Sequence, residues 1–557
     1  FLYYAPGAMH APHHVPAEWA DRYKGEFDDG WSVYREQTLA RMKEMGIVPE
    51  DTELSRHDPD VPEWDSLSDD ERRLYARMME VFAGMLEHTD YHLGRLIQFL
   101  KDIDQYDNTL IMLISDNGAS AEGGETGLVN EGAFFNEVKG TLEQNLAAID
   151  DIGGPKYFNH YPWGWTWAGN TPFRRWKRET FRGGVTDPFI VSWPAGIAAR
   201  GEVRHQYAHA IDMVPTVLEA AGIAPPKEIR GATQSPCDGV SMTASFADAD
   251  APTKHLTQYF EMFGHRSIYH EGWRAVCPWP GDSFTESGGY FGQPMSYDEL
   301  VELDHSGWQL YHVAEDPSEN HDLAETHRDQ LMEMIAQWYI EAGKYNVLPI
   351  DSRGTIRFGE PRPQIAKERE SYIYYPDTQA IPANVAPKVF NRPYTVTAEV
   401  EIPEEGAEGI LMSFGGNDAG IAFYIEDAKL CFVHNYVAVD YFYVKSDEDV
   451  PTGHQFLSYE VEITGEPDIP AGKGAPSKVQ LFVGDRMIGE GMLPVTTPIM
   501  YGLGGAVVVG ADPGSPVTPD WTPPFAFTGT IKRVRFDVSG EPFEDQAREF
   551  RAIMARQ

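Results

Sequence analysis

The stretch TLIMLISDNG, residues 109–118, decides the fold class of this 557-residue chain. Its apolar run is typical of a strand that is covered on both faces. Asp116, Asn117 and Gly118 follow at once, so a carboxylate and an amide lie at the carboxyl end of the predicted strand. Open α/β sheets place their ligands at this edge. A plain turn is the other interpretation, because Asp-Asn-Gly is also ordinary turn chemistry.

Helical patterns flank this strand in the sequence. Apolar residues recur at helical spacing over residues 71–103, and Ser66 with Asp69 resembles a capping box at the start of that helix. Downstream, residues 188–193 predict a second covered strand and residues 212–221 predict an amphipathic helix. Helices that alternate with continuous apolar strands predict an α/β sandwich with a mostly parallel sheet.

The pattern changes beyond residue 250, and a chain of this length is expected to form several domains. Short aromatic strands before a helix predict a small antiparallel sheet, a Pro-rich charged stretch predicts a linker, and many short strands predict a β-sandwich. The predicted division is an α/β domain over 1–250, a small α+β subdomain over 251–348, a linker over 349–385, a β-sandwich over 386–540 and a C-terminal helix over 541–557.

Composition excludes several classes of protein. The chain has 45 Lys and Arg against 86 Asp and Glu, a formal charge of −41, which opposes binding to a nucleic-acid backbone. It has no apolar run of about eighteen residues, so no membrane span is expected. Cys237, Cys277 and Cys431 are too few and too scattered for a disulfide framework or a zinc site. Composition alone is compatible with a periplasmic, extracellular or cytoplasmic protein and sets no oligomeric state.

The first residues have the character of a core strand. FLYYAPGAMHAPHH, residues 1–14, has no initiator Met and no charged leader, so we expect a fragment or a processed product that lacks early strands of the sheet. The following loop carries His10, His13 and His14, which could bind a metal or an anion or donate a proton. His10, nearest the strand end, is the functional candidate, whereas His13 and His14 are expected to cap nearby carbonyls.

One loop concentrates positive charge in this acidic chain. The segment NTPFRRWKRETFRGG, residues 170–184, holds five of the 45 cations within nine residues. This concentration predicts an anion-binding loop with a Gly-Gly hinge, and a solvated loop paired with neighbouring acids is the alternative. Because the loop precedes a predicted strand, at least one cation is expected at the sheet edge.

Together these motifs resemble the type I sulfatases of the alkaline phosphatase superfamily. The resemblance covers residues 1 to about 344, and the β-domain resembles, less specifically, the lectin-like extension of larger bacterial arylsulfatases. It rests on HAP at 10–12, SDNG at 115–118, the loop at 170–184 with DPFIVSWPAGI at 187–197, HAIDMVPTVLEAAGI at 209–223 and WQLYHVAEDPSEN at 308–320.

In that family a cysteine in a C-x-P-S-R signature becomes formylglycine, whose hydrate attacks the sulfur of a sulfate ester while Ca²⁺ polarises the sulfate. The resemblance implies that Asp116 and Asn117 are ligands of one metal ion, with Ca²⁺ favoured over Mg²⁺. It also implies that Lys177 binds the sulfate oxygens and that His10 contacts the sulfate and protonates the leaving oxygen. These residue types suit the reaction, because charge develops on oxygen as the ester bond breaks.

The chain departs from the family at the nucleophile. None of its three cysteines lies in C-x-P-S-R, and no Asp-Asp metal pair precedes His10. Two protein ligands are also fewer than the about six to eight oxygens that Ca²⁺ takes. We therefore expect the parent protein to be an arylsulfatase-type hydrolase of aryl or carbohydrate sulfate esters, and this chain alone to be inactive.

Three other hypotheses fit the same residues. A phosphodiesterase or phosphonate hydrolase of the same superfamily would share the fold and several ligands. A split enzyme would take its nucleophile from a separate N-terminal chain. A non-catalytic glycan-binding protein would stack sugars on aromatic residues of the β-domain, such as Tyr436, Tyr441, Phe442 and Tyr443, although core packing is the simpler role for these side chains.

Overall fold

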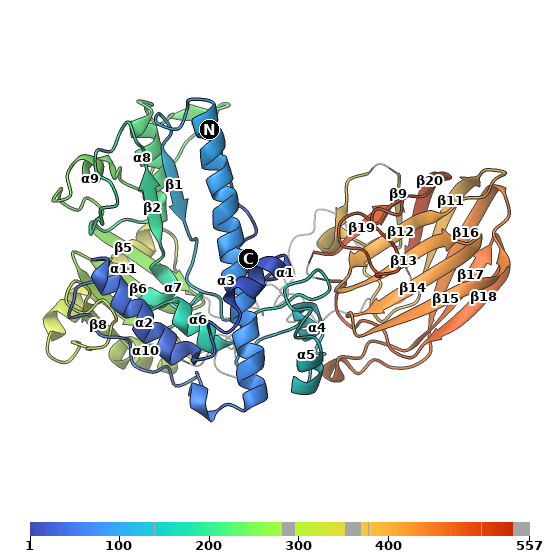
Figure 1. Cartoon of the computed structure of the whole chain (residues 1–557), viewed down its shortest axis with the longest axis horizontal. Helices are drawn as coiled ribbons and strands as arrows, with labels where there is room; N and C mark the ends of the chain where they lie inside the picture. Colours follow the sequence, from blue (N-terminus) through green and yellow to red (C-terminus); the bar gives the residue numbers. More distant parts are fainter. Residues whose placement is uncertain (139, 281–295, 351–368, 377, 503, 539–557) are drawn as a thin grey trace. The chain divides into compact units, whose positions relative to one another are not determined.

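The computed structural model describes residues 1–138, 140–280, 296–350, 369–376, 378–502 and 504–538 (Figure 1). The chain forms two compact units, each assembled from segments that are distant in sequence. Unit 1 consists of Phe1–Asp21, Gly127–His160 and Thr355–Gln557, and unit 2 consists of Arg22–Thr126 and Tyr161–Gly354. The predicted domains are each one continuous stretch of sequence, whereas the segments of the two units alternate along the chain.

Unit 2 contains the long helix α3 (Asp69–Asp102). It begins at Ser68, whose hydroxyl accepts from the Glu71 N–H while the Glu71 carboxylate accepts from the Ser68 N–H. The predicted box at Ser66 and Asp69 is therefore wrong by two residues, since Ser66 ends the preceding 3₁₀ turn η2 (Trp64–Ser66). The first half of the predicted apolar stripe is buried. In its second half Leu93, Ile97 and Leu100 are half-buried and Leu86 is exposed.

The short sheet of unit 2 pairs β1 (Ile111–Ile114) with β2 (Phe189–Ser192). The pair is antiparallel, with Ile111 opposite Ser192, so the predicted mostly parallel sheet is wrong for these two strands. An apolar run indicates burial and carries no information on strand direction. The expected cover on both faces is also incomplete among the described residues, because Leu113 is 45% and Ile190 is 59% exposed.

A second, four-stranded antiparallel sheet in unit 2 has the order β5-β6-β7-β8, as expected for residues 251–348. Apolar side chains of helix α11, led by Trp338, pack against Ile268 and Leu310 of this sheet. The elements are β5 (Thr257–Met262), β6 (His265–His270), β7 (Trp273–Cys277), α10 (Tyr297–Ser306), β8 (Gln309–His312) and α11 (Arg328–Lys344).

The remaining elements of unit 2 are short apart from α2, whose buried Trp31 packs edge-on against Trp64 and Trp165. They are α2 (Gly30–Glu44), α6 (Trp163–Gly169), α7 (Arg182–Val185), η3 (Ala210–Asp212), α8 (Met213–Ala220), β3 (Glu228–Ile229), β4 (Ala232–Thr233) and α9 (Thr243–Ala247), with η1 (Asp21–Tyr23) at the junction of the units in the sequence. No helix among the described residues is both long and apolar enough to cross a membrane.

Unit 1 is a β-sandwich of two six-stranded antiparallel sheets, in the orders β10-β19-β12-β13-β14-β15 and β18-β17-β16-β11-β20-β9. The alternation of apolar and polar residues predicts strands with one buried face. Along β11 every second side chain, from Tyr394 to Ile402, is indeed buried in the core between the sheets. The strands are β9 (Ser371–Tyr374), β10 (Ile381–Pro382), β11 (Tyr394–Ile402), β12 (Gly409–Gly416), β13 (Ala419–Glu426), β14 (Lys429–Tyr436), β15 (Asp440–Asp449), β16 (Gly453–Ile463), β17 (Ser477–Val483), β18 (Arg486–Leu493), β19 (Ala506–Val509) and β20 (Thr530–Val538).

The predicted linker over 349–385 is wrong in its second half. β9 pairs with β20, placing Tyr372 opposite Phe536, and β10 pairs with β19. Two short strands within a Pro-rich, charged stretch escape a composition-based prediction, because composition does not reveal pairing with distant strands. The predicted C-terminal helix over 541–557 lies outside the described residues.

The segment Gly127–His160 belongs to the sandwich unit through buried hydrogen bonds. It carries α4 (Glu131–Phe135) and α5 (Leu142–Ala147), and the short α1 (Ala17–Ala20) lies near the start of the chain. Asn136 Oδ1 accepts from the N–H groups of Ile499 and Met500, both at 3.1 Å, and its amide donates back to the Met500 carbonyl. Satisfying these buried backbone groups fixes the segment on unit 1.

Candidate functional site

Unit 2 brings the Asp116 and Asn117 segment against the Gly-Gly hinge. The Ser115 N–H donates to the Pro188 carbonyl and the Gly118 N–H donates to the Gly184 carbonyl, both at 3.3 Å. A Cβ atom on Gly118 would lie 1.8 Å from the Gly183 carbonyl oxygen, so only glycine permits this approach. Asp116 is exposed and Asn117 is half-buried just beyond β1.

The basic loop is tied to the same strand end by two further contacts. The Lys177 N–H donates to the Ala119 carbonyl at 3.1 Å. Asn170 accepts from the Ala119 N–H at 2.9 Å and donates to the Arg175 carbonyl at 3.0 Å. Three of the four predicted site residues, Asp116, Asn117 and Lys177, therefore lie on segments that meet at the carboxyl end of β1.

The side chain of Lys177 is buried and already ion-paired. Its ammonium nitrogen lies 3.2 Å from Oε2 of Glu122, and Arg178 Nη2 lies 2.7 Å from Oε1 of the same carboxylate. The Ser120 hydroxyl donates to Glu122 at 2.6 Å. The sequence offers no direct signal for this pairing beyond an acidic residue close to SDNG, and Glu122 was not among the predicted site residues. Lys177 and Arg178 are thus paired with a neighbouring acid, but their side chains are buried rather than solvated.

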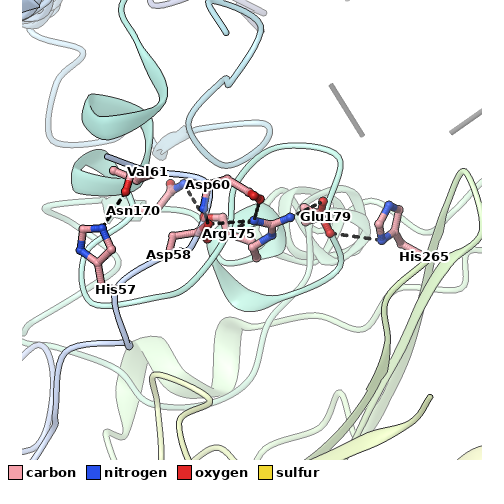
Figure 2. Close-up of polar contacts among 8 residues, drawn as sticks. All are labelled: His57, Asp58, Asp60, Val61, Asn170, Arg175, Glu179 and His265. Carbon is pink, nitrogen blue, oxygen red and sulfur yellow. Dashed lines mark hydrogen bonds and ion pairs between the residues drawn. The ribbon is translucent and has the colours of Figure 1, made fainter. Parts of the chain in front are cut away.

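Arg175 has a structural role that Figure 2 shows. Its guanidinium lies between Asp58 at 3.0 Å, Asp60 at 2.8 Å and Glu179 at 3.6 Å, and Glu179 is 3.1 Å from His265. Burial lowers the pKa of Arg175, but the carboxylates outweigh this effect and the net pKa is raised. Arg175 therefore stays charged and anchors the loop.

A cavity of about 200 Å³ adjoins this ion-pair network. Its polar lining includes Asp58, Asp60, Arg175 and Glu179, and its apolar lining includes Trp279. The carboxylates in this lining are already paired with Arg175, so the cavity lies within a charge-compensated part of the loop.

The other two arginines of the loop contact the small antiparallel subdomain. Arg174 donates to the Tyr311 hydroxyl at 3.2 Å, and Arg182 donates to the Pro317 carbonyl at 2.8 Å. The buried Glu319 accepts from the Arg182 N–H at 2.9 Å. Of the five cations, three thus brace the loop, while Lys177 and Arg178 form a separate pair at Glu122.

Asp187 is a second site residue that the sequence analysis missed. Burial, followed by the negative charge of Asp116, raises the pKa of Asp187 to about 7. Its only sequence signal is an acid directly before a strand. The donor chemistry here suits a hard cation, but no group of three or more His, Cys, Asp or Glu side chains in the described ranges could hold a metal ion. Asp116 and Asn117 do not by themselves complete a calcium site.

His10, the fourth predicted residue, belongs to unit 1. Its N–H donates to the Gly7 carbonyl at 3.0 Å and its Nδ1 lies 2.7 Å from the Ala11 carbonyl. His14 contacts the Tyr157 carbonyl at 2.7 Å, as expected for a carbonyl cap. His13 is buried against the ring of His160, and burial followed by the charge of His160 lowers its pKa.

The aromatic residues considered for sugar stacking are mostly packed. Tyr436 is buried and donates to the Gly472 carbonyl at 2.7 Å. Tyr441 and Phe442 are half-buried. Tyr443 is 49% exposed, but its hydroxyl donates to Asp520 at 2.5 Å. These contacts favour packing over an open stacking platform.

Comparison with known proteins agrees with the motifs. The family model described as Sulfatase matches residues 1–223. Over these residues the chain is similar to the sulfatase family. An arylsulfatase of Klebsiella aerogenes is 29% identical over 265 residues, covering 47% of this chain and 54% of that protein. An uncharacterized sulfatase of Schizosaccharomyces pombe is 28% identical over 352 residues, covering 62% of this chain and 58% of that protein.

Similarity to solved structures is more distant. A protein solved in complex with its substrate D-glucosamine-2-N,6-O-disulfate is 17% identical, with a TM-score of 0.30, over 50% of this chain and 43% of that one. The chain spans little more than half the length of the curated relatives named above.

Proposed function

We propose that the protein containing these residues is an arylsulfatase-type sulfuric ester hydrolase that acts on aryl or carbohydrate sulfate esters. The observation that carries this proposal is the junction of SDNG with the Lys177 loop at the end of β1, within the residues that match the family. A sulfate ester presents oxygens that gain negative charge as its bond breaks. A buried lysine at a strand end is suited to stabilise that charge.

Each predicted residue has a proposed role. Lys177 binds the non-bridging oxygens of the sulfate. His10 delivers a proton to the leaving oxygen, because an alkoxide or phenoxide leaves more easily once protonated. Asp116 and Asn117 provide two ligands of one divalent cation, Ca²⁺ rather than Mg²⁺, and the other ligands come from outside the described residues.

The nucleophile is proposed to come from polypeptide beyond these 557 residues, because the sequence contains no C-x-P-S-R. Formylglycine in such a segment would supply the attacking oxygen. The exposed apolar side chains of Leu113, Ile114 and Ile190 support this proposal. Their strands have the sequence of buried strands, so the exposed faces and edges are suited to pack against further polypeptide. A longer protein and a separate N-terminal chain would both satisfy it.

The test is hydrolysis of p-nitrophenyl sulfate by the protein purified from its source, compared with the purified 557-residue chain. The source protein should turn over the ester and the chain alone should not. Lys177→Met in the complete protein should reduce turnover at least about a hundredfold, as loss of one oxyanion-binding group does. Lys101→Met, at an exposed lysine of α3, is the matched control. Equal activity of the two variants would remove Lys177 from the site.

A panel of substrates separates the alternative within the superfamily. A phosphodiester or a phosphonate monoester hydrolysed more efficiently than every sulfate ester would replace the sulfatase proposal with the phosphodiesterase or phosphonate hydrolase hypothesis.

A further inference from the structure

The cavity beside the Arg175 ion pairs has the size of a small ligand site. Its volume of about 200 Å³ gives room for about seven water molecules at about 30 Å³ each, which suits one sugar ring. The part of its lining that matters for binding consists of Asp58, Asp60, Arg175, Glu179, Phe181 and Trp279. These residues come from three separate segments of unit 2, so the cavity exists only in the folded chain.

The walls of the cavity are fixed by contacts within unit 2. Arg175 is held by the three carboxylates around it (Figure 2). Glu179, one of the three, lies 3.1 Å from Nδ1 of His265, and the same nitrogen accepts from the Trp279 N–H at 3.0 Å. The ring of Trp279 lies against Gly264, where an added Cβ would be 2.4 Å from Cε3 of the ring. A ligand therefore enters a preformed cavity and orders few side chains on binding.

The indole N–H of Trp279 needs an acceptor. Trp279 is only 5% exposed, and its Nε1 has no hydrogen-bond partner among the described residues. A buried donor without an acceptor lowers stability, and most buried polar groups in folded proteins have a partner. Because Trp279 lines the cavity, an oxygen atom of a bound ligand can supply the acceptor.

The same lining offers hydrogen-bond acceptors and flat apolar surface. Asp60 accepts from Arg175 at 2.8 Å, and an ionised carboxylate has about four acceptor sites, so Asp60 can also accept from a ligand hydroxyl. Its side chain is 35% exposed, so a ligand can reach it. The rings of Phe181 and Trp279 provide the apolar surface. A sugar ring matches this combination, because its hydroxyls donate and accept while its C–H groups pack on aromatic rings.

Charged ligands match the lining less well. A protonated amine would meet the carboxylates but has no acceptor for the indole N–H. An anion would supply that acceptor but would lie among the three carboxylates that surround Arg175. Arg174 also lines the cavity, but it already donates to the Tyr311 hydroxyl at 3.2 Å. A neutral ligand with hydroxyl groups satisfies both the donor and the acceptors.

We propose that this cavity binds one neutral sugar unit, and that the substrate of the proposed sulfatase is accordingly a carbohydrate sulfate ester rather than an aryl sulfate. The assignment to the substrate rests on the proposed function, because Arg175 lines the cavity two residues before Lys177 on the same loop. Binding of the sugar itself does not rest on that function. Trp279 is a binding residue for the sugar and takes no part in breaking the ester bond.

The experiment measures binding of the methyl glycosides of glucose, galactose and mannose to the 557-residue chain by saturation-transfer-difference NMR. At least one glycoside should bind. Trp279→Phe keeps an aromatic ring and removes the N–H, so it should weaken binding about three- to tenfold, the effect of one neutral hydrogen bond. Trp193→Phe is the matched control, because the Trp193 indole N–H also lacks a partner among the described residues but does not line the cavity. It should leave binding within about twofold of the wild type.

A second variant protects the test against misfolding of Trp279→Phe. Asp60→Ala removes a partly exposed carboxylate, while Asp58 and Glu179 still hold Arg175, and it should also weaken glycoside binding. The sugar site is overturned if the wild type binds none of the glycosides, or if both folded variants bind them as the wild type does. Tighter binding of ethanolamine than of every glycoside would also overturn it, in favour of an organic cation.

Two further measurements separate this inference from the proposed function. Lys177→Met should leave binding of the neutral glycosides unchanged, because they carry no sulfate. In the complete protein, Trp279→Phe should raise KM for a sulfate monoester of the bound glycoside by about three- to tenfold and leave KM for p-nitrophenyl sulfate unchanged. An equal rise for both esters would contradict the assignment to the substrate. If the complete protein hydrolyses no sulfate ester while its glycoside binding still depends on Trp279, the proposed function fails and the sugar site stands.

Discussion

Replacing Gly118 with alanine places a methyl group against the backbone of the basic loop. The new Cβ would lie 1.8 Å from the Gly183 carbonyl oxygen, 2.8 Å from its carbon and 3.0 Å from the Gly184 Cα. All three are backbone atoms, so the two segments must separate by more than an ångström. Forced overpacking of this kind costs about 1–3 kcal/mol, and separation also breaks the bond between the Gly118 N–H and the Gly184 carbonyl, worth about 1 kcal/mol. We expect Gly118→Ala to lower the free energy of unfolding by about 2–4 kcal/mol.

Urea unfolding followed by circular dichroism measures this loss. Gly94→Ala is the matched control, because Gly94 lies within α3 and a Cβ there meets nothing within 4 Å. That substitution should stabilise the chain by up to about 1 kcal/mol through helix propensity. A Gly118→Ala variant as stable as the wild type would show that β1 and the loop do not meet as described, and would remove the structural basis of the site.

Two further predictions concern buried ion pairs of unit 2. Arg175→Met leaves the buried Asp58 without the guanidinium at 3.0 Å and should lower the free energy of unfolding in urea by about 3–5 kcal/mol. The control Arg73→Met, at an exposed position on α3, should lower it by less than about 0.5 kcal/mol. A loss below about 1 kcal/mol for Arg175→Met would refute the anchoring role. The Nδ1 of His255 lies 2.8 Å from the Asp212 carboxylate, and this hydrogen bond raises the pKa of His255. The pair therefore stabilises the fold fully below the pKa of an unfolded histidine, and this stabilisation is lost as pH rises through the raised pKa of the folded state. The stability difference between wild type and His255→Gln should therefore be larger at pH 5.5 than at pH 9, and an equal difference at both values would contradict the pairing.

The sequence predicts what depends on local pattern. The helix over residues 71–103 and the alternation along β11 are visible because side-chain periodicity follows directly from backbone geometry. The junction of SDNG with the basic loop was expected only as a shared sheet edge, yet both motifs do meet there. The predicted capping box lies two residues before the observed one, because Ser66 and Ser68 are each followed by an acid three positions later and the pattern does not distinguish them.

What the sequence does not predict depends on distant partners. Glu122 lies 55 residues from Lys177 and Asp58 lies 117 residues from Arg175, and no local pattern specifies either pair. The antiparallel direction of β2 against β1 is likewise set by the long connection between them. An apolar run does not specify whether its strand pairs in a parallel or an antiparallel direction. The pKa of Asp187 depends on burial and on Asp116, two properties that exist only in the folded chain.

The proposed sulfatase site takes its nucleophile from outside these 557 residues. Mass spectrometry of the active protein from its source tests this directly. We predict a species heavier than 62.4 kDa, or a second chain that co-purifies, with formylglycine at the cysteine of a C-x-P-S-R peptide. A single 62.4 kDa chain that hydrolyses sulfate esters with Cys237, Cys277 and Cys431 unmodified would contradict it.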